Sequence, residues 1–152
     1  MPVKPKPDGY HTITPYLIVK GGAAAIEFYK KAFGATERFR MPGPDGRIGH
    51  AELQFGDSAI MLADECPERG ALAPQGGGTP VSLYLYMENV DAVVDRAVSA
   101  GAKLKQPVTN QFYGDRSGGV EDPFGHSWYV ATHVEDVSPE EMQKRMAAMK
   151  PK

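Results

Sequence analysis

The second half of this chain repeats the order of chemical features found in the first half, and this repeat restricts the fold more than any other feature of the sequence. Repetition at a fixed spacing is typical of duplicated structural units that bury their apolar surfaces together. The chain is therefore predicted to contain two similar modules that share one core. The matching pairs lie about 67 to 68 residues apart and are Tyr16-Leu17 with Tyr84-Leu85, Ile26 with Val94, Ala32 with Ala100, and Gly34-Ala35 with Gly101-Ala102.

Each module is predicted to contain a strand, a helix and then three further strands. Apolar residues at helical spacing indicate one helix over 25–33 and a second over 90–97. Stretches rich in β-branched and aromatic residues, or alternating apolar with polar residues, indicate the strands. The predicted strands are 10–19, 36–41, 50–55 and 58–63 in the first module, and 81–87, 103–108, 112–120 and 127–132 in the second.

One helix covers only one face of a four-stranded sheet, so each module leaves the other face of its sheet needing cover. The predicted fold class is therefore α+β, with two βαβββ modules forming a curved, barrel-like sheet around a cleft, plus a C-terminal helix. The predicted segments are a flexible arm over 1–9, the first module over 10–63, a linker or lid over 64–80, the second module over 81–134 and the C-terminal helix over 138–150.

The composition argues against several classes of partner. A formal net charge of -2, with scattered rather than clustered Lys and Arg, disfavours nucleic acid. No apolar run approaches the roughly 20 residues that a membrane-spanning helix needs, so no contact with a membrane is expected. The single cysteine, Cys66, cannot form an internal disulfide, and the N-terminal part lacks a basic segment followed by an apolar signal core. A cytoplasmic location is therefore predicted.

Several short stretches resemble a known family. Within the predicted repeat, residues 10–134 resemble the vicinal oxygen chelate superfamily, which includes glyoxalase I, extradiol dioxygenases, fosfomycin-resistance enzymes and bleomycin-resistance proteins, and within it the PhnB-like branch. The resemblance implies paired modules, usually in a dimer, with a ligand cavity inside the curved sheet. The stretches are Thr14-Pro-Tyr-Leu17, Ala25-Ile-Glu-Phe-Tyr-Lys-Lys-Ala-Phe-Gly34, His50-Ala-Glu-Leu53, Phe112-Tyr-Gly-Asp-Arg116 and Asp122-Pro-Phe-Gly-His-Ser-Trp128.

The resemblance also implies four positions for metal ligands, one on the first and one on the last strand of each module. In this chain, Thr14 and Ser82 occupy the first-strand positions, and Met61 and Tyr129 occupy the last-strand positions. None of the four carries the imidazole or carboxylate that is typical of a divalent metal site. We therefore expect no metal at these positions, and no cofactor is predicted.

Other polar and aromatic residues are candidates for a site. His50 and Glu52 have the most ligand-like spacing, but a hydrogen-bonded sheet face is favoured over metal binding. Asp115 and Arg116 either tie the modules together or face an anionic ligand. The aromatic residues of the second module can line a pocket for a flat or apolar molecule, although core packing is favoured for any single one. No catalytic residue is assigned, and the predicted ligand-binding residues are Tyr84, Tyr86, Tyr113, Asp115, Arg116, Trp128 and Tyr129.

The leading hypothesis for function is a metal-free protein that binds a small organic molecule. One alternative is a lyase, isomerase or dioxygenase of the same superfamily, with an atypical metal site or none. Another is a structural module that recognises a partner protein through its terminal helix. A homodimer is also predicted, because the sheets have exposed edges and because the terminal helix carries an apolar stripe of Met142, Met146 and Met149.

Overall fold

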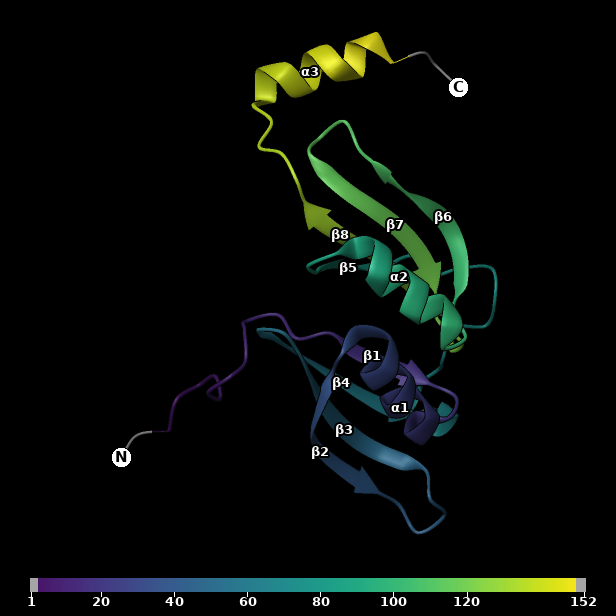
Figure 1. Ribbon diagram of the computed structural model, residues 1–152. Coiled ribbons are helices and arrows are strands. Elements are labelled where there is room, and N and C mark those ends of the chain that lie inside the picture. The colour runs from purple at the N-terminus through teal and green to yellow at the C-terminus, as the bar shows by residue number, and fades with distance from the viewer. Residues whose placement is uncertain (1–2, 150–152) are drawn as a thin grey trace.

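The computed structural model describes residues 3–149, which form two βαβββ modules followed by a further helix (Figure 1). A 3-10 turn, η1 (Pro67–Arg69), lies in the connector between the modules, and α3 (Pro139–Ala148) follows the second module. The first module consists of β1 (Tyr16–Val19), α1 (Gly22–Phe33), β2 (Thr36–Pro42), β3 (Ile48–Phe55) and β4 (Ser58–Asp64). The second consists of β5 (Ser82–Tyr86), α2 (Val90–Ser99), β6 (Lys103–Asn110), β7 (Asp115–Glu121) and β8 (Ser127–His133).

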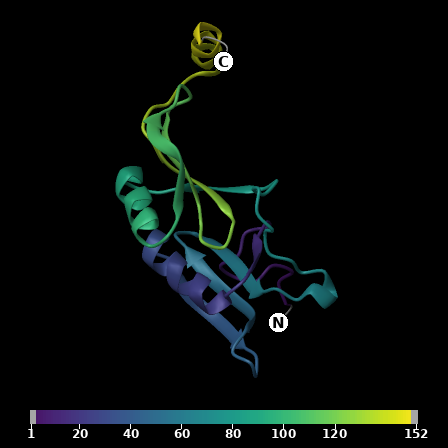
Figure 2. The same ribbon diagram turned by 90° about the vertical axis from the view of Figure 1, so that its right-hand side faces the viewer.

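Both modules have the same sheet topology. The strand orders are β1-β4-β3-β2 and β5-β8-β7-β6, with the first pair of each sheet parallel and the others antiparallel. Tyr16 lies opposite Met61 in the first parallel pair, and Tyr84 lies opposite Tyr129 in the second. The predicted α+β class with two βαβββ modules is therefore confirmed. The sheets are curved, but they remain two separate four-stranded sheets and do not close into a barrel (Figure 2).

The core is continuous across the boundary between the modules. Helices α1 and α2 contact each other, and Figure 2 shows both along one side of the molecule. The indole ring of Trp128 lies against the rings of Phe33 and Phe55, with centroid distances of 4.8 and 5.5 Å. Each large apolar side chain that is fully buried contributes about 1.5–3 kcal/mol to stability. The helical residues buried in this core are Ala25, Ile26, Phe28, Tyr29, Ala32, Phe33, Val90, Val93, Val94 and Ala97.

The strand predicted over 112–120 begins only at Asp115. The residues before it form a turn, because Gly114 has a φ of +102°, which lies outside the range of a strand. The carbonyl of Gly114 accepts hydrogen bonds from the amides of Val134 and Glu135. A Cβ at Gly114 would overlap the carbonyl oxygen of Glu135. Glycine is therefore required at this turn, and the turn determines where β7 starts.

Helix α3 stands apart from both sheets, beyond one end of the second module (Figure 1). The guanidinium of Arg145 holds it there by donating hydrogen bonds to the carboxylate of Glu135 and to the carbonyl of Phe112. Of the helix predicted over 138–150, the last residue lies outside the described part of the chain, as do residues 1 and 2 of the predicted arm. No helix within residues 3–149 is long and apolar enough to cross a membrane.

Candidate functional site

Asp115 is the polar centre of the face of the second sheet that α2 leaves uncovered, which we call the open face. It is the first residue of β7 and is only 3% exposed. Its Oδ2 accepts hydrogen bonds from the phenols of Tyr84 at 2.7 Å and Tyr86 at 2.8 Å, both on β5. Its Oδ1 lies 2.8 Å from Nδ1 of His133 at the end of β8. Side chains from three strands therefore meet at one buried carboxylate.

His133 lies between two carboxylates, because its Nε2 is 2.7 Å from Oδ1 of Asp136. The hydrogen bonds to Asp115 and Asp136 raise the pKa of His133. Burial alone would raise the pKa of Asp115, but the hydrogen bonds from His133, Tyr84 and Tyr86 outweigh burial and hold that pKa below its ordinary value. Asp115 is therefore ionised at neutral pH and fixes the groups around it.

Tyrosine rings form the exposed part of this cluster. The ring centroids of Tyr84 and Tyr86 are 5.2 Å apart, and Tyr84 stacks with Tyr129 of β8 at 6.1 Å. Burial, followed by hydrogen bonds to Asp115 and Tyr113, raises the pKa of Tyr84, and the hydrogen bond to Asp115 raises that of Tyr86. These phenols therefore keep their protons and act as donors, while their rings remain available for stacking.

Arg116 does not belong to this cluster. Successive residues of a strand point to opposite faces, so Arg116 lies on the face that α2 covers. Its Nε and Nη2 donate to the carboxylate of Asp91 on α2 at 2.8 and 2.9 Å, and its Nη1 donates to Asn110 at 3.1 Å. Arg116 thus connects β7 to α2 within the second module. It neither pairs with Asp115 nor ties the two modules together.

The other predicted ligand-binding residues fall in two places. Trp128 is 1% exposed in the shared core and points away from its neighbour Tyr129. Tyr113 lies in the turn before β7, with its ring 5.3 Å from that of Phe112 and its phenol near Tyr84. Of the seven predicted residues, the structure brings together Tyr84, Tyr86, Tyr113, Asp115 and Tyr129, and it places Arg116 and Trp128 elsewhere.

The stretch Asp122–Trp128 connects the two modules. The Oδ2 atom of Asp122 accepts hydrogen bonds from the phenol of Tyr29 at 2.5 Å and from Nε1 of Trp128 at 2.9 Å. Its Oδ1 accepts from the backbone amides of Phe124 and His126. Because Tyr29 lies on α1 of the first module, one buried carboxylate joins both modules. Asp122 therefore holds the two modules together.

The open face of the first sheet, opposite α1, carries a polar group of its own. The Nε2 atom of His50 lies 2.8 Å from Oε2 of Glu52, and the two side chains are 24% and 22% exposed. The Nδ1 atom of His50 lies 2.9 Å from the hydroxyl of Tyr16. His50 and Glu52 therefore form a hydrogen-bonded group on the face of the sheet, which is the interpretation that their spacing favours over metal binding.

The residues at the four positions that the resemblance assigns to metal ligands do not fit a divalent metal. Met61 lies opposite Tyr16, Tyr129 lies opposite Tyr84, and the hydroxyl of Thr14 donates to a backbone carbonyl. Thioether, hydroxyl and phenol groups are not the ligands that such ions prefer, which are imidazole, thiolate and carboxylate. Within residues 3–149, no group of three or more His, Cys, Asp or Glu side chains is placed to hold an ion.

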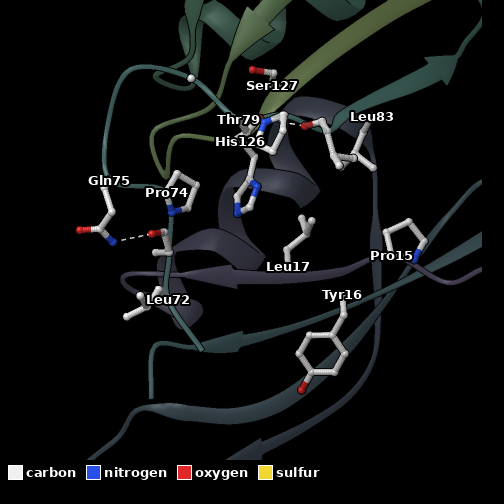
Figure 3. Close-up of a pocket in the computed structure, with 14 residues that line it drawn as sticks. Pro15, Tyr16, Leu17, Leu72, Pro74, Gln75, Thr79, Leu83, His126 and Ser127 are labelled. Atoms are coloured by element: carbon white, nitrogen blue, oxygen red, sulfur yellow. Dashed lines mark hydrogen bonds between the residues drawn. The ribbon is translucent and has the colours of Figure 1, made fainter. Parts of the chain in front are cut away.

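A cavity of about 480 Å³ lies between the modules, beneath the connector (Figure 3). Leu72 and Pro74 of the connector line it, together with Leu17 of β1 and Leu83 of β5. His126 also lines the cavity, and its Nε2 lies 2.8 Å from a backbone carbonyl oxygen of β1. The walls are mostly apolar, and the side chains that meet at Asp115 do not line the cavity.

His133 is not among the residues that the sequence predicts to bind a ligand. In an antiparallel hairpin the start of one strand lies opposite the end of the next, and Asp115 lies opposite His133 in this register. The signal in the sequence was therefore an acidic residue within the strand predicted over 112–120 and a histidine directly after the strand predicted over 127–132. Recognising it required the start of β7, which the turn at Gly114 determines.

The repeated βαβββ module with a curved sheet defines the class of protein. The sequence matches the model of the Glyoxalase/Bleomycin resistance protein/Dioxygenase superfamily over residues 9–130. The chain belongs to this superfamily.

The chain is also similar to individual proteins from other organisms. The chain is 41% identical over 140 residues to the uncharacterized protein Mb0911c of Mycobacterium bovis, covering 90% of this chain and 92% of that protein. It is similar to the structure of the Arabidopsis thaliana gene product At5g48480, with 29% identity and a TM-score of 0.67 over 80% of this chain and 98% of that one. It is also similar to TioX from Micromonospora sp. ML1, with 27% identity and a TM-score of 0.66 over 82% and 99% of the two chains.

Proposed function

We propose that this protein binds a small organic molecule at the open face of its second sheet and needs no divalent metal to do so. The observation that carries this proposal is the convergence of Tyr84, Tyr86 and His133 on the buried carboxylate of Asp115. A few fixed polar groups beside aromatic rings are typical of small-molecule sites. We also propose that the chain belongs to the PhnB-like branch of the superfamily, because its stretches 112–116 and 122–128 resemble that branch.

The site is suited to a flat, partly apolar molecule. Tyr86 and Tyr84 are 60% and 44% exposed and offer ring faces for stacking. The hydrogen bonds from their phenols to Asp115 hold both rings in place. Binding therefore requires little further ordering of side chains, which reduces its entropic cost.

Asp115 and His133 form the polar centre of this proposed site. At the superfamily's ligand positions the chain has Thr14, Met61, Ser82 and Tyr129, which are poor ligands for divalent ions. Elemental analysis of the dialysed protein is expected to show less than one equivalent of Ni, Zn, Fe or Mn per chain. Stoichiometric metal that survives dialysis would favour the enzymatic alternative.

Replacement of both Tyr84 and Tyr86 by alanine is expected to raise the Kd of the bound molecule about tenfold or more, since roughly 1.4 kcal/mol of binding free energy corresponds to a factor of ten. The physical reason is the loss of the two exposed ring faces. Native mass spectrometry of the purified protein is the measurement that identifies a copurifying molecule. Isothermal titration calorimetry with that compound then measures the Kd of each variant.

Arg116→Met is the matched control, because Arg116 also lies on β7 but contacts α2 on the opposite face. This variant is expected to keep the Kd within about twofold. Its free energy of unfolding is expected to change by less than about 1 kcal/mol, as is usual for partly exposed ion pairs. Equal weakening of binding in both variants, or unchanged binding in the tyrosine variant, would exclude the proposed site.

We further propose that the protein is a homodimer. Large apolar side chains are exposed on the open faces of both sheets, including Phe39 and Met41 in the first module and Tyr84 and Tyr86 in the second. A second copy would cover part of this surface and complete the wall of a cleft. Sedimentation at micromolar concentration is expected to give about twice the mass of one chain. A monomeric mass under these conditions would disprove the dimer.

A further inference from the structure

We propose that Tyr16, His50 and Glu52 form a second chemical site, in which the base-activated phenol of Tyr16 accepts an acyl group from an activated ester. The hydroxyl of Tyr16 lies 2.9 Å from Nδ1 of His50, and Nε2 of His50 lies 2.8 Å from Oε2 of Glu52. A nucleophile, a base and a group that orients the base are thus in hydrogen-bond contact in that order. This site lies on the first sheet and does not depend on the proposed ligand site of the second.

The sheet register builds this arrangement. Met61 of β4 lies opposite Tyr16 on one side and opposite Glu52 on the other, so the three residues form one row across the sheet. His50 and Glu52 are two residues apart on β3 and therefore point to the same face. The ring centroids of Tyr16 and His50 are 5.5 Å apart. The row brings Tyr16 close to β3, where the imidazole of His50 lies next to the phenol.

The proposed chemistry uses one tautomer of His50. In this tautomer Nε2 carries the proton and donates it in a hydrogen bond to the carboxylate of Glu52. Nδ1 then carries the lone pair that accepts the hydrogen bond from the hydroxyl of Tyr16. The second carboxylate oxygen of Glu52 accepts a hydrogen bond from the hydroxyl of Tyr10. The guanidinium of Arg38 lies 4.6 Å from the centre of the Tyr10 ring, which helps to keep Tyr10 in place.

The second module contains a counterpart of Tyr16 that has no imidazole beside its phenol. Tyr84 occupies the position in the repeat that corresponds to Tyr16, but its hydroxyl donates to the carboxylate of Asp115. Burial and the contacts with Asp115 and Tyr113 raise the pKa of Tyr84, so this phenol keeps its proton. At Tyr16 the acceptor is an imidazole, which can take the proton. The two phenols thus occupy equivalent positions in the repeat, but Tyr16 lies next to an imidazole and Tyr84 next to a carboxylate.

With p-nitrophenyl acetate as the ester, the acyl group that is transferred is an acetyl group. The phenol oxygen of Tyr16 attacks the ester carbonyl carbon while its proton passes to Nδ1 of His50. The bond between the carbonyl carbon and the p-nitrophenolate oxygen breaks, and p-nitrophenolate leaves. The imidazolium of His50, stabilised by Glu52, then releases its proton to solvent. The product is Tyr16 with an acetyl ester on its oxygen.

The experiment is treatment of the full-length protein with p-nitrophenyl acetate, followed by peptide mass spectrometry to time the acetylation of each tyrosine. Tyr16 is expected to be acetylated at least about tenfold faster than Tyr84 and Tyr86, which is less than the roughly 10²–10⁴-fold that general-base assistance typically provides. Tyr86 is 60% exposed and Tyr16 only 47%, so exposure alone would favour Tyr86. A rate at Tyr16 no higher than that at Tyr86 would overturn the proposal.

Variants separate the role of the base from simple proximity. His50→Gln is expected to lower acetylation at Tyr16 about tenfold, and Glu52→Gln to lower it by less, since the amide oxygen of glutamine can still accept a hydrogen bond from Nε2. Arg116→Met is the control and is expected to leave all tyrosine rates unchanged. Unchanged rates at Tyr84 and Tyr86 in His50→Gln show that the fold is intact. If His50→Gln then reacts at Tyr16 as fast as the unmodified sequence, no base-activated phenol exists.

Discussion

Asp122→Ala is expected to lower the free energy of unfolding by about 3–5 kcal/mol, because each buried donor left without a partner costs about 1–3 kcal/mol. The change removes the acceptor of the Tyr29 phenol and of the Trp128 indole, both of which are fully buried. It also removes the acceptor of two backbone amides in the turn before β8. Urea unfolding followed by the fluorescence of the single tryptophan measures the loss.

Two further variants show whether the loss at Asp122 comes from this network. Tyr29→Phe removes one of the two buried side-chain donors and keeps the ring in the core, so a smaller loss of about 1–2 kcal/mol is expected. Asp91→Ala also removes a carboxylate that accepts several hydrogen bonds, but its pair with Arg116 is exposed, so the expected loss is below about 1 kcal/mol. A loss at Asp122 no larger than that at Asp91 would show that Asp122 does not hold the modules together.

Gly114→Ala is expected to lower the free energy of unfolding by about 2–5 kcal/mol. The positive φ costs a non-glycine residue about 1–2 kcal/mol, and overlap in a packed region adds about 1–3 kcal/mol. The added Cβ would displace Glu135 and, with it, the segment that places Asp136 next to His133. The raised pKa of His133 should then fall toward its ordinary value, which NMR titration of the histidine ring protons can measure.

Gly76→Ala is the matched control for this prediction. Gly76 has a φ of +97°, close to the +102° of Gly114, but no atom lies within 4 Å of a Cβ built there. The control therefore has the backbone strain without the overlap, and its expected cost is about 1–2 kcal/mol. It should leave the pKa of His133 unchanged. Equal losses of stability in the two variants would mean that the close approach to Glu135 is unimportant.

Most of the fold was predictable because the signals are local. The spacing of Ile26, Tyr29 and Phe33 predicts α1, and the same residues are buried on one face of that helix in the structure. The strands follow from alternation and from turn residues in the same way, and the repeat predicts that both modules have one architecture. The start of β7 was placed too early, because the need for glycine at residue 114 arises from Glu135, which is distant in the sequence.

The candidate site was predictable only in part. The sequence identified Tyr84, Tyr86 and Asp115 as candidates because their chemistry is visible in their residue types. It could not decide which of Asp115 and Arg116 faces the tyrosines, since that depends on where β7 begins and on the position of α2. It also could not separate Trp128 from Tyr129, because only packing against the first module shows that the indole is buried.

Residue types and their spacing determined the number of modules and the order of their elements. They also determined that four positions lack metal-preferring groups. These signals lie in residues that are close to one another in the sequence. The pairing of Asp115 with His133, the link from Asp122 to Tyr29 and the row from Tyr16 to Glu52 depend on strand register and on contact between modules. Such contacts join residues that are far apart in the sequence. They form only when the whole core packs, so the tertiary structure decided the chemistry of both sheet faces.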